Sequence, residues 1–358
     1  LMLEGVGGLL TGTGKVSGDL DQPQLQASLL SEQLRVDGTS IEDLELSLRA
    51  GMAHTAPLEL KASATSPAAA EDTAPIALRL ALGGTNKQHA VQLEVQSGEQ
   101  RITAELNGGL DQPLASWQGT LDGLTLNTAS FGHWRLQQPA NIDASAESAS
   151  LERTCLTRIR GYANTGTVQP TQNKADPGRT CAQLAWQAGG ESSASVELAN
   201  LPLRLLVQDI RSRVDGVLKA RLSAAGDLRA NGNINFSPGS LKLDTGDTRS
   251  LAHGGGALTL NIDESGLHAT LGLDTPEQGR IDAQVTLPAM QRLPLPETQP
   301  LEGRLKASIP DLAGLASWFE ELEASQGSLS MDFDLGGTLE QPRLEGMLAL
   351  QDAGADIP

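Results

Sequence analysis

The chain has 358 residues, with 26 basic and 44 acidic side chains and a formal net charge of -18. This acidity argues against nucleic-acid binding, which needs a basic surface, and against tight binding to an anionic membrane surface. Aromatic residues make up only 3% of the chain, so an apolar interior is expected to consist mainly of Leu, Ile, Val and Ala. No apolar run reaches the roughly 18 residues of a membrane-spanning helix, and no signal segment is recognisable.

The sequence alternates apolar and polar residues over much of its length. In residues 43–48 every second residue is a leucine, and residues 76–82, 91–95, 258–262 and 329–335 likewise have a large apolar residue at every second position. Because successive side chains of a strand point to opposite faces, each of these segments predicts a half-buried strand. Gly, Asn, Asp and Ser between the segments predict hairpin turns, and therefore antiparallel sheet.

Two segments depart from this alternation. Residues 310–324 place apolar side chains at helical intervals behind Asp311, a suitable N-cap, and predict a short helix. Residues 201–214 predict a second short helix. Residues 63–75 and 164–178 contain Pro among small and polar residues, which is typical of loops.

The number of predicted strands constrains the architecture. A strand and turn in every 10–20 residues gives roughly 16–20 strands, whereas strongly twisted open sheets rarely exceed about 10 strands without curling or splitting. Several separate sandwiches or one long, curled sheet would satisfy this limit. No linker, including the Pro-rich connector 293–300, is long and polar enough to separate domains. We therefore predict an all-β fold: an elongated, curled, mostly antiparallel sheet that forms an open hydrophobic groove, with one or two short helices.

Three six-residue stretches repeat almost the same letters: GDLDQP at 18–23, GGLDQP at 108–113 and GTLEQP at 337–342. Their Gly and Pro residues are typical of turns. Their spacing is uneven, which disfavours the regular rungs of a β-solenoid spacer. The repeat therefore predicts turns between paired strands rather than a ligand site.

The sequence predicts no enzyme, no cofactor and no metal site. The Gly-rich start lacks a phosphate-binding loop, because Leu9 stands five residues before Gly14 and Val16 replaces the Ser or Thr that holds magnesium. No G-x-S-x-G nucleophile motif occurs. No histidine has a second ligand at metal spacing. The five histidines are His54, His89, His133, His253 and His268.

The two cysteines, Cys155 and Cys181, flank a polar segment that contains Pro. Two buried free thiols are one interpretation. A disulfide that closes this segment is the other, and it would stabilise the fold by roughly 3.5 kcal/mol on the chain-entropy estimate. The residues alone leave both alternatives open.

The second half of the sequence resembles the TamB family. In residues 303–358 the succession G-x-L-x-A-x-IPDL, a predicted short helix, G-x-L and then G-x-L-x-x-P-x-L-x-G-x-L-x-L is similar to that family. Upstream, TCLTRIRG at 154–161 and RTCAQLAWQ at 179–187 resemble the TamB segment that carries a cysteine pair. The resemblance covers most of 150–358. Residues 1–149 share only the D-L-x-L and G-x-L-x-x-P style of the wider AsmA-like superfamily.

This resemblance implies a location and partners. TamB proteins have an inner-membrane anchor, a long β-rich periplasmic body and a C-terminal domain that docks on the outer-membrane Omp85-type protein TamA. The chain then corresponds to a middle portion without the anchor or the docking region. Its expected parts are AsmA-like β-groove repeats over 1–149, a β-groove segment with the cysteine pair and an inserted loop over 150–300, and a short helix with strands, at the start of the C-terminal region, over 301–358. A periplasmic location favours a disulfide between Cys155 and Cys181.

The resemblance also implies a function. A β-taco groove lined by aliphatic side chains would carry phospholipid between the membranes by shielding its acyl chains from water. The expected lining residues are Leu44, Leu46, Leu48, Leu78, Leu80, Leu93, Val95, Leu258, Leu260, Leu271, Leu273, Val285, Met331, Phe333 and Leu335. Two alternatives stay open. The same faces could form the closed core of a sandwich, or exposed strand edges could act with TamA as a scaffold for autotransporter secretion and outer-membrane protein assembly.

Overall fold

The fold is built almost entirely of strands. The structure is a computed structural model that describes residues 6–36, 39–68, 74–112, 114–128, 132–159, 178–203, 210–242, 250–275, 279–290, 292, 295–311 and 324–356. The strands are β1 (Val6–Gly8), β2 (Thr11–Ser17), β3 (Gln24–Val36), β4 (Thr39–Gly51), β5 (Leu58–Ser66), β6 (Ile76–Gly84), β7 (His89–Ser97), β8 (Gln100–Leu110), β9 (Ser116–Thr128), β10 (Gly132–Leu136), β11 (Ala140–Ser145), β12 (Ser148–Arg158), β13 (Arg179–Gln187), β14 (Ser192–Pro202), β15 (Ile210–Arg211), β16 (Arg213–Leu222), β17 (Leu228–Phe236), β18 (Gly239–Lys242), β19 (Ser250–His253), β20 (Gly255–Asp263), β21 (Gly266–Asp274), β22 (Arg280–Pro288), β23 (Glu302–Ile309), β24 (Ala324–Gly337) and β25 (Pro342–Asp356).

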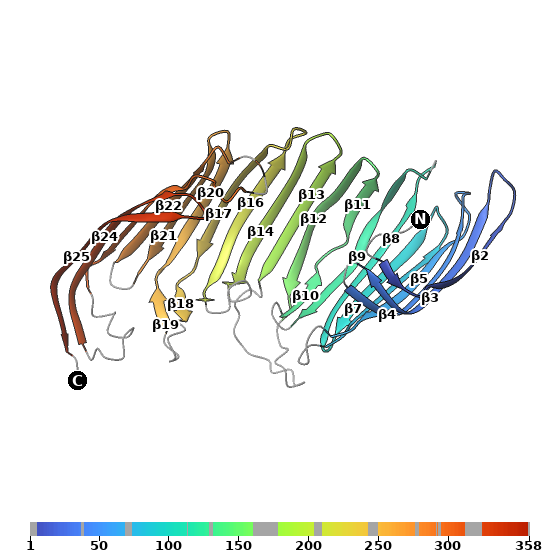
Figure 1. Ribbon diagram of the computed structural model, residues 1–358, viewed down its shortest axis with the longest axis horizontal. Coiled ribbons are helices and arrows are strands. Elements are labelled where there is room, and N and C mark those ends of the chain that lie inside the picture. The colour runs from blue at the N-terminus through green and yellow to red at the C-terminus, as the bar shows by residue number, and fades with distance from the viewer. Residues whose placement is uncertain are drawn as a thin grey trace. The chain divides into compact units, whose positions relative to one another are not determined.

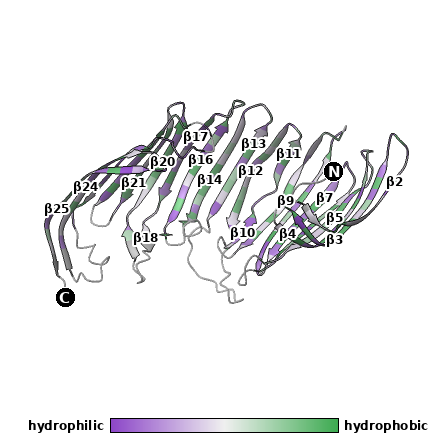
Figure 2. Ribbon diagram, in the orientation of Figure 1, coloured by the Kyte–Doolittle hydropathy of each residue, from purple (hydrophilic) through white to green (hydrophobic). Residues whose placement is uncertain are grey.

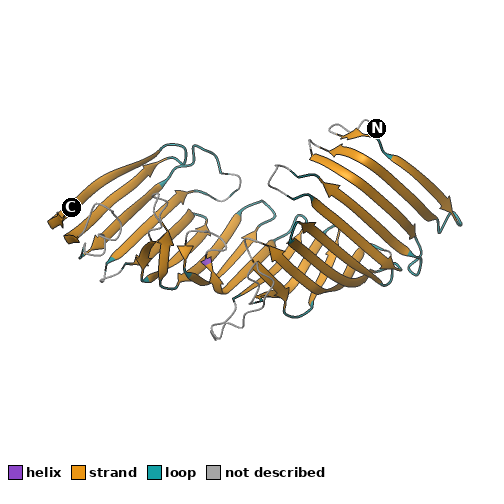
Figure 3. Cartoon of the chain, turned by 90° about the horizontal axis from the view of Figure 1, so that it is seen from below, coloured by secondary structure: helices purple, strands orange, loops and turns teal. Residues whose placement is uncertain are grey.

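Within the described residues, 22 strands belong to one sheet, and β15, β18 and β19 form a separate three-stranded sheet. The register of every described strand pair is antiparallel. Figure 3 shows strands as nearly all of the drawn elements. The prediction of an all-β, antiparallel fold dominated by one large sheet is therefore confirmed.

The predicted helices are not part of this fold as far as it is described. The prediction for 201–214 is wrong at both ends, because Leu201 of β14 pairs with Val214 of β16 and Pro202 pairs with Arg213. Cross-strand pairing there outweighs the local helical spacing. Residues 204–209, between those ends, lie outside the described residues. The helix predicted for 310–324 falls mainly on residues 312–323, which are also outside them.

The chain divides into two compact units, which are treated separately below. Unit 1 holds residues 1–175 and 183–185, and unit 2 holds residues 176–182 and 186–358. In unit 1, strands β3 to β9 pair with their neighbours in chain order, and Figure 1 shows them side by side. Two positions hold a pair of short strands in tandem: β1 and β2 against β3, and β10 and β11 against β9.

Unit 2 repeats this construction with a different set of strands. The order of pairing is β14, β16, β17, β20, β21, β22, β23, β24 and β25, each strand antiparallel to the next. Figure 1 shows this succession from yellow to red. The omitted numbers β15, β18 and β19 belong to the small sheet, where β18 pairs with both of the others. Each unit is thus a meander with mostly local connections.

The three copies of the six-residue repeat lie between paired strands. The first copy joins β2 to β3, the second begins in the last three residues of β8 and leads towards β9, and the third joins β24 to β25. Gly18 and Gly337 have φ angles of 94° and 91°, which a side chain with a Cβ rarely adopts. Their place as turn residues agrees with the interpretation drawn from the sequence.

Candidate functional site

The apolar side chains of unit 1 form rows that cross the strands. Cross-strand register places one residue from each of seven strands in line in two rows and from four strands in a third, and the three rows are named after their β6 residue. The Leu80 row consists of Leu29, Leu46, Ala62, Leu80, Leu93, Ala104 and Leu124. The Leu82 row consists of Ala27, Leu48, Leu60, Leu82, Val91, Leu106 and Leu121. The Leu78 row consists of Leu78, Val95, Ile102 and Leu126. Figure 2 shows the alternation of apolar and polar residues along the strands from which these rows arise.

These rows contain six of the seven lining residues predicted in unit 1. The exception is Leu44, which pairs with Ser31 beside a register shift between Glu42 and Glu45. Asp43 has a φ of 50°, and this local bulge explains why Leu44 falls out of line. The row side chains are mostly half-buried; Leu78 is 38% exposed. The face is therefore apolar without being a closed core.

Unit 2 has four rows of the same kind, named after residues of β20 and β21. The Leu267 row consists of Ala194, Ala220, Ala230, Ile262, Leu267 and Leu287. The Leu260 row consists of Val196, Leu218, Gly232, Leu260, Ala269, Val285, Gly303, Leu335 and Leu344. The Leu271 row consists of Leu198, Gly216, Ile234, Leu258, Leu271, Ala283, Leu305, Phe333 and Gly346. The Leu273 row consists of Leu201, Val214, Phe236, Gly256, Leu273, Ile281, Ala307, Met331 and Leu348.

All eight lining residues predicted in unit 2 lie in three of these rows, but their surroundings differ. Leu258, Leu271 and Phe333 share the Leu271 row and are half-buried. Leu273 and Met331 lie in the Leu273 row and are also half-buried. The other three predicted residues pack against a buried apolar cluster, so part of their surface is already covered by protein; these residues are Leu260, Val285 and Leu335.

That cluster consists of residues that were not among the predicted lining residues. Ile262 and Leu287 of the Leu267 row pack with Met290 and Leu301, and all four are 5–9% exposed. Met290 and Leu301 come from the connector between β22 and β23, here named the rim strap and described at residues 289–290, 292 and 295–301. Only the Pro-rich part of this connector is recognisable in the sequence, because a contact between a connector and a sheet face has no local periodicity.

In unit 1, polar groups join the turns that follow β4, β6 and β8. These groups are here named the rim clasp and belong to His54, Asn86, His89, Leu110 and Trp117. The side-chain amide of Asn86 donates to the carbonyls of Gly51 (2.7 Å) and Ala53 (2.8 Å). His54 Nε2 lies 2.9 Å from the carbonyl of Leu110, and the Leu110 amide donates to the carbonyl of Asn86 at 2.8 Å. Three neighbouring turns are therefore hydrogen-bonded to one another.

The aromatic part of the clasp assigns the donor and acceptor nitrogens of one histidine ring. Trp117 Nε1 donates to His89 Nε2 at 2.8 Å, so Nε2 is an acceptor, and Nδ1 then donates to the carbonyl of Thr85 at 3.0 Å. The indole ring lies over two glycines: a Cβ on Gly108 or Gly119 would lie 2.5 Å or 2.6 Å from its atoms. Glycine at both positions leaves space for the indole ring. These two glycines are the feature of the sequence from which the position of the ring could have been predicted.

The opposite face of the sheet is charged. In unit 2, Arg304 donates two hydrogen bonds of 2.7 Å to the Asp332 carboxylate, and this contact lowers the pKa of Asp332. Arg280 pairs with Asp274 (2.8 Å) and Asp282 (2.9 Å). The acidic residues that alternate with the apolar ones therefore lie on a solvated face, as predicted from the alternation.

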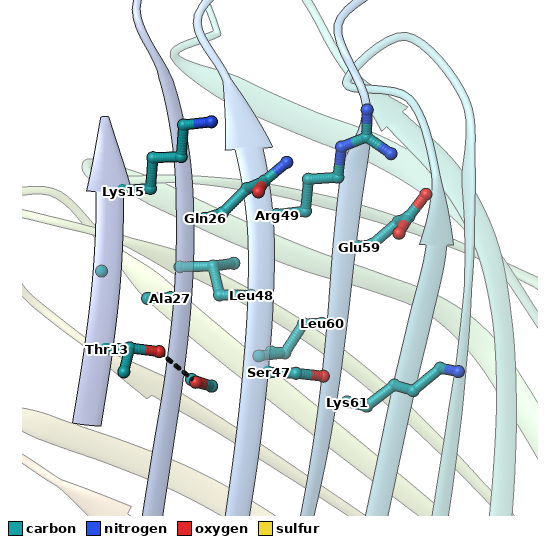
Figure 4. A pocket seen from close by; sticks show the side chains of 12 residues that line it. Thr13, Lys15, Gln26, Ala27, Ser47, Leu48, Arg49, Glu59, Leu60 and Lys61 are labelled. Atoms are coloured by element: carbon teal, nitrogen blue, oxygen red, sulfur yellow. Dashed lines mark hydrogen bonds between the residues drawn. The ribbon is translucent and has the colours of Figure 1, made fainter. Parts of the chain in front are cut away.

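A pocket on this charged face of unit 1 is lined by residues of β2 to β5. In Figure 4, Lys15, Gln26, Arg49 and Glu59 follow one another across these four strands, in agreement with their register.

Within the described ranges, no group of three or more His, Cys, Asp and Glu side chains could hold a metal ion. The same residues contain no helix that is long and apolar enough to cross a membrane.

The two cysteines lie in strands. Cys155 belongs to β12 and Cys181 to β13, and both are disulfide-bonded. Cys181 is only 2% exposed. The disulfide expected from the resemblance is therefore present.

The comparison with protein families gives one match. Residues 1–350 match the family model described as the N-terminal domain of TamB. No solved structure matches the chain. The division predicted at 149–150 and 300–301 stays a prediction.

Proposed function

Because the chain belongs to the TamB family, we propose that its apolar rows carry the acyl chains of phospholipids between the inner and outer membranes, without enzymatic chemistry. The observation that carries this proposal is the uninterrupted apolar register within each unit. In unit 1 the Leu80 row crosses seven strands, and none of its members is polar.

The size of a row suits a mobile acyl chain. Strands lie about 4.8 Å apart, so seven strands span roughly 29 Å. One leaflet of a bilayer, half of the ~30 Å hydrocarbon core, accommodates a chain in roughly 15 Å. A row is therefore longer than one acyl chain. Since transfer from water is favourable by about 0.8 kcal/mol per buried CH₂ group, an aliphatic surface holds the chain without fixing its position. This supports conduction along the row rather than binding at one point.

The proposal places the chain in the cell envelope. A TamB protein spans the periplasm, so we infer a periplasmic location, an attachment to the inner membrane and an association with TamA through parts outside this chain. The net charge of -18 and the charged face of the sheet are compatible with an aqueous compartment. The disulfide is compatible with an oxidising one.

A photo-crosslinking amino acid on β7 tests the lipid proposal in cells. A probe at Leu93, in the Leu80 row, is expected to capture phospholipid, which mass spectrometry of the crosslinked protein would identify. The matched control is Gln92, the preceding residue, whose exposed side chain is on the charged face. Equal capture at Leu93 and Gln92 would contradict the proposal.

One observation favours a second candidate function, a scaffold for outer-membrane protein assembly. Strand β25 pairs with β24 and, among the described residues, with no strand on its other side. Its apolar side chains Leu344, Leu348 and Leu350 are 55–58% exposed. An exposed edge of this kind accepts an added strand. Probes along β25 that capture outer-membrane protein precursors, with no lipid captured at Leu93, would favour this candidate over the first.

A further inference from the structure

We propose that the rim strap is a fixed wall that excludes acyl chains from the Leu267 row of unit 2 and confines them to the Leu271 row and to the half-buried members of the Leu273 row, such as Leu273 and Met331. This inference rests on the proposed lipid function and assigns the part of the apolar face that the lipid contacts. It divides the predicted lining residues of unit 2 into two classes that the sequence does not distinguish.

The strap covers the end of the apolar face with its own side chains. Met290 (5% exposed) and Leu301 (9%) pack with Ile262 (7%) and Leu287 (6%), which lie in the Leu267 row. Leu295 of the strap packs against the same cluster. A side chain as buried as Ile262 has no surface left for an acyl chain, so the strap already occupies the place that lipid would take.

Hydrogen bonds within the strap hold it to β22. The buried side chain of Gln299 (7% exposed) donates from Nε2 to the carbonyl of Pro288, the last residue of β22, at 2.7 Å. The backbone N–H of Gln299 donates to the carbonyl of Pro296 at 3.0 Å. A buried, bonded amide of this kind fixes the path of the connector.

Two neighbouring turns hold the strap from either side. Arg292 donates to the Asp227 carboxylate from Nη2 at 2.9 Å and from Nε at 3.1 Å, which joins the strap to the turn before β17. On the other side, the amides of Leu339 and Glu340, in the turn before β25, donate to carbonyls of the strap at 3.1 Å and 3.2 Å. An element fixed to three parts of the sheet acts as a wall rather than as a lid.

The next rows along the strands are left for cargo. Moving two residues along a strand shifts the position by about 7 Å. On β20 this distance separates Ile262, under the strap, from Leu260, which packs against the edge of the cluster. A second step reaches Leu258, which is half-buried and lies in the Leu271 row. The lipid path of unit 2 therefore begins about two rows from the strap.

Three photo-crosslinking probes on one strand test this placement. The full chain carries the probe at Leu258, Ile262 or Thr259, is incubated with vesicles of phosphatidylethanolamine and phosphatidylglycerol, and is irradiated. Leu258 is expected to capture lipid. Thr259, exposed on the other face, is expected to capture none. Ile262 is expected to crosslink internally to the strap peptide instead of to lipid, and this product also shows that the probe has not unfolded the cluster.

A strap-release variant gives an independent measurement. The double substitution Met290→Ala and Leu301→Ala removes the strap's side chains from the cluster, while the probe is placed at Leu260. Lipid capture at Leu260 is expected to rise several-fold. Capture at Leu93 in unit 1, measured in the same variant, is expected to stay unchanged and shows that the rest of the chain still functions.

The outcomes separate the two proposals. Lipid capture at Ile262 equal to that at Leu258, or no rise at Leu260 in the strap-release variant, overturns the wall while the lipid function stands. If neither Leu258 nor Leu93 captures lipid, the lipid function is overturned, and the proposal of a wall is overturned with it.

Discussion

The two units build their apolar rows in the same way and join the adjacent turns by hydrogen bonds, but only the rim of unit 2, among the described residues, adds a cluster of buried apolar side chains. In unit 1 the rim clasp depends on hydrogen bonds of Asn86, His89 and Trp117. In unit 2 the rim strap is also hydrogen-bonded to its neighbouring turns, and it adds the apolar packing of Met290 and Leu301. The difference follows from the length of the connections, because a short turn brings buried backbone groups that need partners, whereas a long connector brings apolar side chains of its own.

The largest expected effect comes from breaking the apolar rim. Leu287→Ala should lower the free energy of unfolding by about 2–5 kcal/mol, because it leaves a cavity among Ile262, Met290 and Leu301. Leu106→Ala in unit 1 is the matched control, since Leu106 is half-buried and not covered by a strap. Urea denaturation measures both variants. Equal losses would mean that the strap adds no packing.

A smaller effect is expected from breaking the polar rim. Asn86 is 3% exposed, and Asn86→Ala would leave the carbonyls of Gly51 and Ala53 without their donor. Stability should fall by about 1–3 kcal/mol, the cost of buried unsatisfied groups. Asn231→Ala, on an exposed face position of β17, should change the urea midpoint little. A similar shift in both variants would show that the clasp does not depend on the burial of its amide.

The smallest expected effect concerns the charge in a turn beside the clasp. The Asp111 carboxylate accepts hydrogen bonds from the amides of Ser116 and Ala115 and from the Ser116 hydroxyl, and these bonds lower the pKa of Asp111. A lowered folded-state pKa gives stability that is present above the unfolded value of about 3.9 and is lost as the pH falls through the folded value.

Asp111→Asn should therefore flatten the acid part of the stability profile and leave its shape above about pH 5 unchanged. Thermal unfolding measured at a series of pH values checks this expectation. Ser116→Ala removes only the hydroxyl donor and should produce a smaller change in the same direction. If the acid slope persists in Asp111→Asn, the slope arises from other carboxylates.

The rows were predictable from sequence, and their surroundings were not. Leu80 and Leu93 lie opposite each other because period-two alternation is a local property of each strand, and antiparallel turns fix the register. The covering of Ile262 by Leu301 depends on how a connector folds back, which no periodicity encodes. The helix predicted around Leu201 failed for a related reason, because pairing with Val214 is a tertiary contact.

The disulfide was a different kind of prediction. The spacing of Cys155 and Cys181 left two alternatives, and only the resemblance to a periplasmic family favoured the bond that is present. The clasp was missed, although its signal was in the sequence: Trp117 is one of only four tryptophans and lies close to Gly108 and Gly119. A bulky ring with two nearby glycines predicts a close approach, but not the histidine that it contacts.

The repeated six-residue turn has a mechanical consequence. In the second copy the Leu110 amide donates to the carbonyl of Asn86, and in the third copy the Leu339 amide donates to the carbonyl of Gln299. In both cases the bond reaches the adjacent turn on the same side of the sheet, beyond the end of the strand ladder. A strand pair attached at its ladder and again at its turn cannot pivot about its last ladder bond. The repeat therefore reinforces the edge of the sheet, where the strands of a sheet under load would begin to separate.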